Sequence, residues 1–523
     1  MIGRWWTTRR IRAASWLLGG AIVFFFVLLL SRYVLPPYLI NFVRNRSALI
    51  IKDRFHSDVQ FGHFDIRLVL PRLVVTGDNV FLTRHGETSD TLVFVRSFSI
   101  DTDLVRFIET PAHIRDIRLE GMAIHVPPRG TTRPWSPEVK RHYPVIIDHL
   151  ECDDCELDIQ PRKANKEPLQ FVIHRLTMQD AGLGRSAPYQ ARLTNAVPSG
   201  EIISSGRFGP WQPDEPSLTP LSGNYSFIHA DLDPFPGIAG KLDSTGSFEG
   251  ILERIVADGE TTTPDFALDV TAHPLALNTQ FHAIIDGTTG DTALDPVRAQ
   301  FRHTSLVARG GVFGIPGQRG KAVLLDVVLG PGRLEDVLYL GVKSPTPLMT
   351  GDLRLNTKLA IQPGPGVISR RLKLNGRFTA NSAQPTSPEM REKLQELSRR
   401  AQGKPSDQSA GSATFDLKGR FDLQKGLATF SNLLFTIPGA SLDLAGGYGL
   451  HSEELDFRGR LRLEAKLSQT TTGVKSFFLK AVDPFVKGKD AGTILPVKVT
   501  GTREKPEFGL AFRDSGKKKQ WRN

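Results

Sequence analysis

The sequence predicts a mainly β protein, in which an N-terminal transmembrane helix is followed by a long antiparallel β-sheet with a few short helices. Apolar and polar residues alternate with a period of two over most of the chain, as in strands that have one buried and one solvated face. Gly (48) and Pro (35) are frequent among the 523 residues. Turn signals recur about every 8–12 residues, as a meander requires. An uncharged apolar run precedes the first strand.

The N-terminal region has the pattern of a membrane anchor. Residues 1–12 form a basic tail with four arginines. The run Ala13–Leu30 carries no charge, and at about 1.5 Å per residue it nearly spans a hydrocarbon core of about 30 Å. We therefore assign residues 13–35 as a transmembrane anchor, which leaves the N-terminus in the cytoplasm and places the rest of the chain across the membrane. A cleaved signal peptide is the alternative, but residues 31–37 offer no small-x-small cleavage site.

The charge of the chain bears on its partners. The net charge is +11, from 66 Lys and Arg against 55 Asp and Glu. Part of the excess lies in the N-terminal arginines and in a second basic tail, residues 514–523, which contains Lys517, Lys518 and Lys519. Beyond a membrane anchor the chain meets no nucleic acid, so nucleic acid is not expected as a partner. Basic charge that faces an anionic lipid surface is the simpler interpretation.

The sequence has two cysteines, Cys152 and Cys155. Their spacing suits a local disulfide or a free pair on a strand turn, a zinc site completed by His149 and an aspartate, or a redox CxxC motif. The residues that follow, Glu156–Ile159, alternate like a strand and not like the helix of a redox motif. A local disulfide or a free pair is the preferred interpretation, and the other two stay open.

Residues 36–132 are predicted to form a helix and the opening strands. Two prolines end the anchor, and Tyr38–Phe55 has an amphipathic helical pattern that suits either a membrane interface or a cap on the first strands. From Val59 to Leu68 the residues alternate with one slip of phase. Residues 133–351 are then predicted to form a central β region.

Residues 352–513 show the clearest strands. From Leu353 to Ile361, apolar residues alternate with charged and amide side chains. From Leu455 to Leu467, one set of alternate residues is apolar apart from Gly459, and the other set is entirely charged. Antiparallel strands with one solvated face have this pattern, whereas buried parallel strands do not.

One segment of this region, residues 387–402, is predicted to leave the sheet as a helix. Ser387 and Pro388 suit the N-cap and the first helical position, and Gly403 suits the end. Its apolar residues form a single stripe: Met390, Leu394, Leu397 and Ala401. The stripe is expected to pack on the sheet or to plug one end of it, and docking of a partner is the alternative. A shorter helix is predicted at Gly473–Val482.

No catalytic motif is found. The segment Gly314–Ala322 resembles a phosphate-binding loop, but Ile315 stands where the first glycine belongs and Ala322 replaces the Ser or Thr that would hold magnesium. The sequence contains no GxSxG elbow, HExxH motif or EF-hand loop. We predict no enzymatic activity, no metal and no cofactor. A hydrolase site made by carboxylates that converge only in three dimensions is the alternative.

Strand patterns at the two ends of the chain point to a family. Near the start, Val59–Gly62 leads into Leu70–Val80, which contains a P-x-L-x-V-x-x-x-x-V run, and Ile114–Ile124 follows. Near the end, Ser412–Leu463 contains a G-x-F-x-L-x-x-G strand, and Ile494–Phe508 contains ILPVKVTGT and PEF. In this order, behind an anchor, these segments resemble the AsmA-like proteins of diderm bacterial envelopes, which are relatives of TamB and of the chorein-type lipid bridges.

The resemblance implies a long, curved, antiparallel sheet whose concave apolar face forms a groove for acyl chains. It further implies a protein anchored in the inner membrane, with its bulk in the periplasm, that binds or conducts phospholipids between membranes and so supports outer-membrane biogenesis. The alternative is an assembly or scaffold factor for outer-membrane proteins, which would pair its sheet edges with client strands.

The apolar sides of the two clearest strands supply the residues predicted to line this groove. They are Leu353, Leu355, Leu359, Leu455, Phe457, Leu461 and Leu463. Ordinary sheet core is the competing interpretation for each of them, because core and groove residues alternate in the same way. A one-sided sheet must cover its apolar face, and the predicted helices are too few to cover this one.

Overall fold

The structure of the chain is a computed structural model. It describes residues 38, 57–69, 71–84, 91–126, 145–159, 169–182, 184–195, 197–212, 215–235, 237–269, 271–318, 320–344, 346–364, 366–464, 493–503 and 505–511. The predictions for the basic tails (1–12 and 514–523), the anchor (13–35), the helix at 38–55 apart from Tyr38, and the helix at 473–482 concern residues outside these ranges. None of the helices within them is long and apolar enough to cross a membrane.

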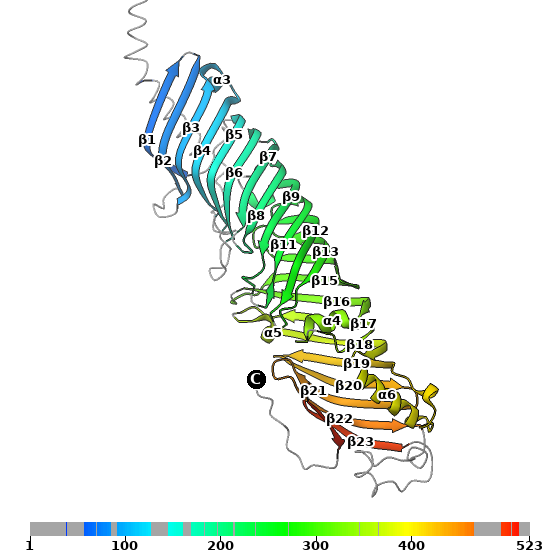
Figure 1. Ribbon diagram of the computed structural model, residues 1–523. Helices are drawn as coiled ribbons and strands as arrows, with labels where there is room; N and C mark the ends of the chain where they lie inside the picture. Colours follow the sequence, from blue (N-terminus) through cyan, green and yellow to red (C-terminus); the bar gives the residue numbers. More distant parts are fainter. Residues whose placement is uncertain are drawn as a thin grey trace, which may run out of the picture. The chain divides into compact units, whose positions relative to one another are not determined.

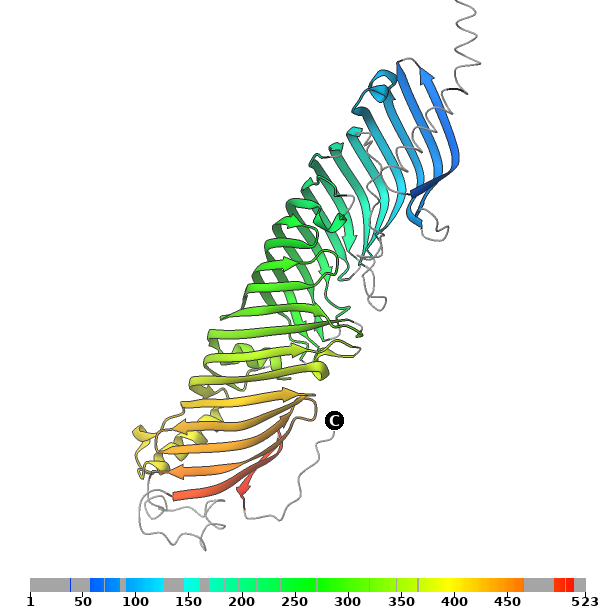
Figure 2. The same cartoon turned by 180° about the vertical axis from the view of Figure 1, so that it is seen from behind.

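The chain divides into two compact units, and the described part of each is mainly β (Figures 1 and 2). The first unit comprises the described residues up to 194 together with 203–222, and the second comprises 195–202 and those from 223 onward. The strands before residue 210 are β1 (Ser57–Val69), β2 (Arg72–Arg84), β3 (Thr91–Asp103), β4 (Ala112–Val126), β5 (Val145–Ile159), β6 (Leu169–Gly182), β7 (Ala187–Asn195) and β8 (Gly200–Phe208).

The later strands follow in chain order. They are β9 (Pro220–Asp231), β10 (Ile238–Ala239), β11 (Lys241–Ile251), β12 (Arg254–Leu268), β13 (Leu275–Ile285), β14 (Thr292–Phe301), β15 (Thr304–Gly314), β16 (Lys321–Arg333), β17 (Met349–Ile361), β18 (Leu372–Pro385), β19 (Phe415–Gln424), β20 (Leu427–Ile437), β21 (Ala440–Gly449), β22 (Glu454–Leu463), β23 (Thr493–Thr502) and β24 (Pro506–Leu510). The helices in the described ranges are α3 (Leu104–Ile108), α4 (Leu334–Gly341), α5 (Ile368–Arg371) and α6 (Pro388–Ala401), with 3-10 turns at 216–218 and 408–410. The prediction of a mainly β chain with few helices is confirmed for these residues.

In the first unit, β1 to β5 each pair with the next strand in sequence, up to β6. All of these pairs are antiparallel except β4 with β5, which is parallel. The prediction of an antiparallel sheet is therefore wrong at this pair. A parallel neighbour requires a connection long enough to return along the strand. The 18 residues 127–144 are long enough for this connection. Alternation within a strand does not indicate whether its neighbour runs parallel or antiparallel, so the sequence patterns could not predict this pair.

In the strands of the first unit, the set of alternate residues that faces the core changes partway along the strand. In β2 the buried positions change from odd-numbered, as at Val75, to even-numbered, as at Val80. In β3 the buried Val95 is odd-numbered, whereas Phe98 packs on the core from an even-numbered position. A regular strand keeps one parity on each face, so each strand must contain an irregular residue at the change.

These irregular residues are aligned across the sheet. The register places one from each strand along a phase-shift line: Gly62, Asn79, Arg96, Gly121 and Asp154. The φ angle is positive at Asn79 (52°), Gly121 (62°) and Asp154 (52°). The positive φ angle favours glycine at position 121, as it favours Asn and Asp at the other two positions. The slip in the alternation of Val59–Leu68 falls at Gly62, where this line crosses β1.

The two cysteines lie on either side of the phase-shift line in β5 and form a disulfide. Cys152 and Cys155 are 0% and 1% exposed. Residues three apart in a regular strand face opposite sides, but the left-handed conformation of Asp154 turns both sulfur atoms to one face, with the Cα atoms 6.3 Å apart. The preferred interpretation of the cysteines is confirmed. No group of three or more His, Cys, Asp or Glu side chains within the described ranges could hold a metal ion.

In the second unit, the strands from β11 to β24 each pair with the next in antiparallel register. The register collects the alternate apolar residues on one side, termed the apolar face. On β17 and β18, for example, Leu353 lies opposite Ala380 and Leu355 opposite Phe378. Charged and amide residues such as Arg354 lie on the other side, termed the polar face. The predicted alternation of the C-terminal strands is confirmed.

Helix α6 lies against the apolar face of β18–β21 (Figure 1). It begins and ends within one residue of the predicted range 387–402, and the Ser387 side chain accepts a hydrogen bond from the backbone N–H of Met390. Leu394 and Leu397 pack on the sheet, as expected of the stripe, and Ala401 is buried. Met390 is 41% exposed, so the first turn stands clear of the sheet.

Helix α4, which no sequence pattern predicts, is a second cover for the apolar face. Its Asp336 is 1% exposed and accepts hydrogen bonds from the backbone N–H of His303 (3.0 Å) and from Thr304 Oγ1 (2.9 Å). Arg302, in the same turn, lies over the ring of Tyr339 at 4.5 Å. These contacts attach α4 to the turn between β14 and β15. The helix spans only Leu334–Gly341, which is too short for a clear period of 3.6 residues.

The segment that resembles a phosphate-binding loop is a hairpin turn. Strand β15 ends at Gly314 and β16 begins at Lys321, so Val323–Val327 is a strand, as predicted, and not the helix that a phosphate would require. The first side chain of β16, Lys321, lies 3.7 Å from Asp291.

Candidate functional site: the apolar face of the second unit

The apolar face of β16–β23 contains two sets of residue rows that cross the strands. The first set, near α4 and α6, comprises Leu329, Leu353, Leu355, Phe378, Ala380, Leu417, Phe435, Leu461 and Leu463. The second set, farther along the same strands, is termed the open strip. It comprises Leu325, Leu359, Leu374, Phe421, Leu423, Phe430, Tyr448, Leu455, Phe457 and Val499. The two sets differ in what covers them.

The first set is the interior of the second unit. Leu353 is 4% exposed and belongs to one cluster with Leu334 of α4 and Ala401 of α6. Val337 and Leu338 of α4 and Leu394 and Leu397 of α6 pack against the same cluster. We term this set the covered core, because helices and sheet together remove it from water.

Within the described ranges no helix packs on the open strip, although two of its residues, Leu423 (6% exposed) and Phe457 (7% exposed), are buried among strand residues. The cluster around Phe457 is made, within the described ranges, of strand residues alone. Aromatic rings run across it: the centroids of Phe421 and Phe430 are 6.5 Å apart, and those of Phe430 and Phe457 are 5.8 Å apart. Phe378, at the border with the covered core, lies 6.2 Å from Phe421. Rings at these distances attract one another, so these contacts stabilise the strip although no described helix packs on it.

The residues predicted for the groove divide between the two sets. Leu353, Leu355, Leu461 and Leu463 belong to the covered core, where they contact the rest of the protein. Leu359, Leu455 and Phe457 lie on the open strip. For the first four, and also for Phe457, which is 7% exposed within a cluster of strand residues, the competing interpretation of ordinary sheet core fits the structure.

Several residues of the open strip are absent from the sequence prediction. Phe421 lies in the G-x-F-x-L-x-x-G strand of the AsmA-like pattern, and this pattern is the signal that could have found it. Phe430 follows no simple alternation, because β20 contains one extra residue at Ser431–Asn432, which shifts its register against both β19 and β21. A shift of this kind exchanges the faces of all following residues. Strand-by-strand alternation therefore does not place Phe430.

Tyr448 supplies the one hydroxyl among the residues of the open strip. Burial raises the pKa of Tyr448, and the nearby carboxylate of Glu453 raises it further, against the opposing effect of Arg503. The phenol is neutral at physiological pH, so the strip carries no formal charge.

The same face becomes more polar toward β11–β13. Ser244 is 6% exposed, contacts Tyr225 Oη at 3.1 Å and donates to the Glu260 carbonyl at 3.0 Å. The hydroxyls of Thr261 and Thr279 lie 2.6 Å apart on neighbouring strands. Hydroxyl pairs of this kind satisfy one another. The open strip is thus the part of the face where apolar side chains are continuous from strand to strand.

A shallow pocket of about 540 Å³ lies on the polar face of β11–β14. It is lined by Asp258, Glu260, Gln280, His282 and Arg298, among others. His282 Nδ1 lies 2.8 Å from an Asp258 carboxylate oxygen, and both side chains are substantially exposed. Exposed charges of mixed sign on a sheet surface are ordinarily solvated.

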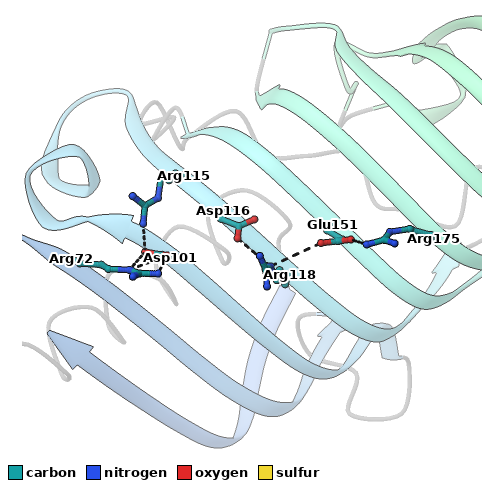
Figure 3. Close-up of polar contacts among 7 residues, drawn as sticks. All are labelled: Arg72, Asp101, Arg115, Asp116, Arg118, Glu151 and Arg175. Atoms are coloured by element: carbon teal, nitrogen blue, oxygen red, sulfur yellow. Dashed lines mark hydrogen bonds and ion pairs between the residues drawn. The ribbon is translucent and has the colours of Figure 1, made fainter. Parts of the chain in front are cut away.

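The polar face of the first unit is a network of ion pairs (Figure 3). Asp101 of β3 accepts hydrogen bonds from Arg72 Nε at 2.9 Å and from Arg115 at 2.8 Å. The Arg72 guanidinium, followed by Arg115, holds the pKa of Asp101 below its usual value, although desolvation opposes the shift. The Asp101 side chain is 14% exposed.

The network continues across β4, β5 and β6. Arg118 lies 3.2 Å from Asp116 and 4.0 Å from Glu151. Glu151 also accepts a hydrogen bond from Arg175, which lowers the pKa of that carboxyl. Figure 3 shows acids and bases in alternation from strand to strand. Each of the seven charged side chains in Figure 3 therefore has a counter-charge within the protein.

Comparison with known proteins gives no relative for this chain: no family model, no curated protein and no solved structure matches. The resemblance to the AsmA-like proteins stays a prediction from sequence patterns.

Proposed function

We propose that this protein binds phospholipids along the open strip and conducts them between membranes. The observation that carries the proposal is the strip itself, where apolar side chains of several strands adjoin and no described helix covers them. The same sheet has helices over its covered core. Contiguous apolar surface of this kind usually marks a binding site, and aliphatic and aromatic side chains are suitable partners for acyl chains.

The mechanism is partition between water and the strip. Each methylene group of an acyl chain that leaves water contributes about 0.8 kcal/mol. Headgroups stay in water at the rim, because the strip carries no charged side chain. Neighbouring strands offer equivalent apolar contacts about 4.8 Å apart. A bound chain can therefore slide from strand to strand without a covalent step or a catalytic residue.

The proposed location follows from the sequence. The uncharged run at 13–30 and the arginines before it support an inner-membrane anchor with the bulk of the chain in the periplasm. The AsmA-like patterns at both ends support a role in phospholipid supply to the outer membrane.

The proposal is tested by photo-crosslinking in the intact chain. A photoreactive amino acid replaces Leu359 or Phe430 on the open strip, and Leu324 in the control. Leu324 is 47% exposed on the polar face of β16, one residue from the cross-strand partner of Leu359. After irradiation in a diderm host, mass spectrometry should find phospholipid adducts at 359 and 430 and none at 324.

Other outcomes separate the alternatives. Adducts with outer-membrane proteins at the strip, with no lipid, would favour the scaffold function. Equal lipid adducts at all three positions would mean that lipid contacts the chain without selecting a face, and the proposal would be abandoned.

A further inference from the structure

The polar face of β17–β23 is the side of the sheet turned away from α6 (Figure 2). The strand register places two adjacent rows of cations on this face. One row contains Arg354, Lys418, Asp443 and Arg460, with Thr379, Leu434 and Pro496 between them. The other contains Arg377, Arg420, Arg458 and Lys498, with Asn356, Asn432 and Ala445 between them. These two rows are termed the cationic band.

Positive charge predominates within these two rows, whereas the adjoining rows of the polar face carry aspartates such as Asp416, Asp422 and Asp456. Asp443 is the one acid on the two rows within the described ranges. It lies opposite Arg460 in the register but forms no ion pair with it within 4 Å. Arg458 reaches Asp456, on the adjoining row, at 3.9 Å. The arginines of the band and Lys418 are exposed to solvent.

Like charges face each other at two places in the band. Arg377 of β18 lies directly opposite Arg420 of β19, and Arg458 of β22 lies directly opposite Lys498 of β23. Like charges at directly opposed positions destabilise a sheet. The polar face of the first unit shows the usual arrangement, in which acids and bases alternate (Figure 3). An external anion would relieve the repulsion in the band.

We propose that the cationic band binds the phosphate groups of an anionic phospholipid surface. Adjacent strands are about 4.8 Å apart, so the two cations of each opposed pair can contact one phosphate from both sides with charge-assisted hydrogen bonds. The band crosses several strands, which matches an array of headgroups better than a single ligand. It lies on the opposite face from the open strip, so it does not hold the headgroups of lipids bound there and is independent of the proposed function.

Two observations favour a membrane over other polyanions. The rows contain no aromatic side chain on which nucleotide bases could stack. At the border of the band, Ile494 is 55% exposed and lies opposite Arg462. Exposed apolar side chains beside cations suit the boundary between headgroups and acyl chains.

The test measures capture of anionic vesicles by the full-length chain held in nanodiscs of phosphatidylcholine. The vesicles contain phosphatidylglycerol and phosphatidylcholine. The band variant carries Arg377→Gln, Arg420→Gln, Arg458→Gln and Lys498→Gln. The charge-matched control carries Arg254→Gln, Lys343→Gln, Arg370→Gln and Lys404→Gln, all exposed and outside the band. We expect the band variant to lose about tenfold or more in apparent affinity, since each cation near an anionic surface contributes appreciably. The control should lose less than twofold.

A second measurement shows where on the chain the vesicles bind. It distinguishes binding at the cationic band from binding at the basic ends of the chain. A fluorophore on Asn432→Cys, in the centre of the band, should be quenched by vesicles with headgroup quenchers. One on Asn278→Cys, exposed on β13, should not be quenched. Equal capture by the band variant and the control, or no quenching at 432, overturns the proposal. Duplex DNA is tested as a competitor. If it displaces the vesicles and shields the fluorophore at 432 from quenching, nucleic acid would replace the lipid surface as the proposed partner.

Discussion

The covered core and the open strip are parts of the same face of the same strands, and they differ only in what lies over them. Leu353 and Leu359 are six residues apart on β17 and point to the same side. Helices α4 and α6 enclose the first, whereas no described helix reaches the second. The comparison teaches that period-two alternation identifies an apolar face but does not distinguish protein core from ligand-binding surface. That distinction depends on tertiary contacts made from outside the strand.

The largest effect is expected from a charge in the covered core. Leu353→Asp would bury a carboxylate at a site that is 4% exposed, with no cation to pair it, which costs several kcal/mol. We expect loss of the folded second unit, measured as loss of its cooperative thermal transition. The control Leu324→Asp, on the polar face, should keep that transition. A stable Leu353→Asp protein would show that the helices do not close the core.

The next largest effect is expected from a substitution that loosens the contact between α6 and the sheet. Ser398 is 0% exposed and donates a hydrogen bond to the Pro438 carbonyl at 3.0 Å. Ser398→Ala leaves that carbonyl without this donor and should cost about 1–3 kcal/mol in urea unfolding. Fluorescence of an apolar dye should rise as α6 loosens. The exposed Ser305→Ala in β15 should change neither quantity, and equal effects of the two substitutions would contradict a covering role.

Truncation of the open strip should cost less than truncation of the core. We expect Phe430→Ala to lower the free energy of unfolding by roughly 1–2 kcal/mol, since its ring is only partly buried, against about 2–5 kcal/mol for Leu353→Ala. Phospholipid recovered with the purified chain should fall for Phe430→Ala and stay unchanged for Leu324→Ala. A cost for Phe430→Ala as large as that for Leu353→Ala would mean that the strip is core as well.

The smallest effect concerns the titration of Tyr448. Its pKa is raised by burial, so the folded state holds the phenolic proton more tightly than the unfolded state. This contribution to stability is fully present below the unfolded pKa of about 10 and is lost as pH rises from there through the folded pKa. NMR of labelled tyrosine, assigned with Tyr448→Phe, measures it. Bound lipid should raise the pKa of Tyr448 further and leave that of Tyr189, in the first unit, unchanged. Equal shifts at both residues would argue against lipid on the strip.

Sequence patterns predict the strands, their faces and α6, because each depends on residues that are near in sequence. Leu455 and Phe457 are correctly placed on the apolar face for this reason, and Ser387 correctly marks the start of α6. The division of that face is not predictable in the same way. Leu461 and Leu463 are covered because Leu394 and Leu397 reach the same cluster from α6. The face of Phe430 cannot be predicted from alternation because of the bulge in β20. The parallel pair of β4 and β5 depends on the path of the chain between them.

The phase-shift line of the first unit has a consequence for how its strands find their register. In a regular sheet, a strand that slides by two residues keeps every side chain on its own face, so the error is cheap. Here the irregular residue of each strand must meet that of its neighbour, as Asn79 meets Arg96 and Gly121 lies beside Asp154. After a slide of two residues, the side chains between the displaced irregular positions would point to the wrong face. The line acts as an alignment mark that β1 to β5 share, and the disulfide between Cys152 and Cys155 clamps the backbone at that mark in β5.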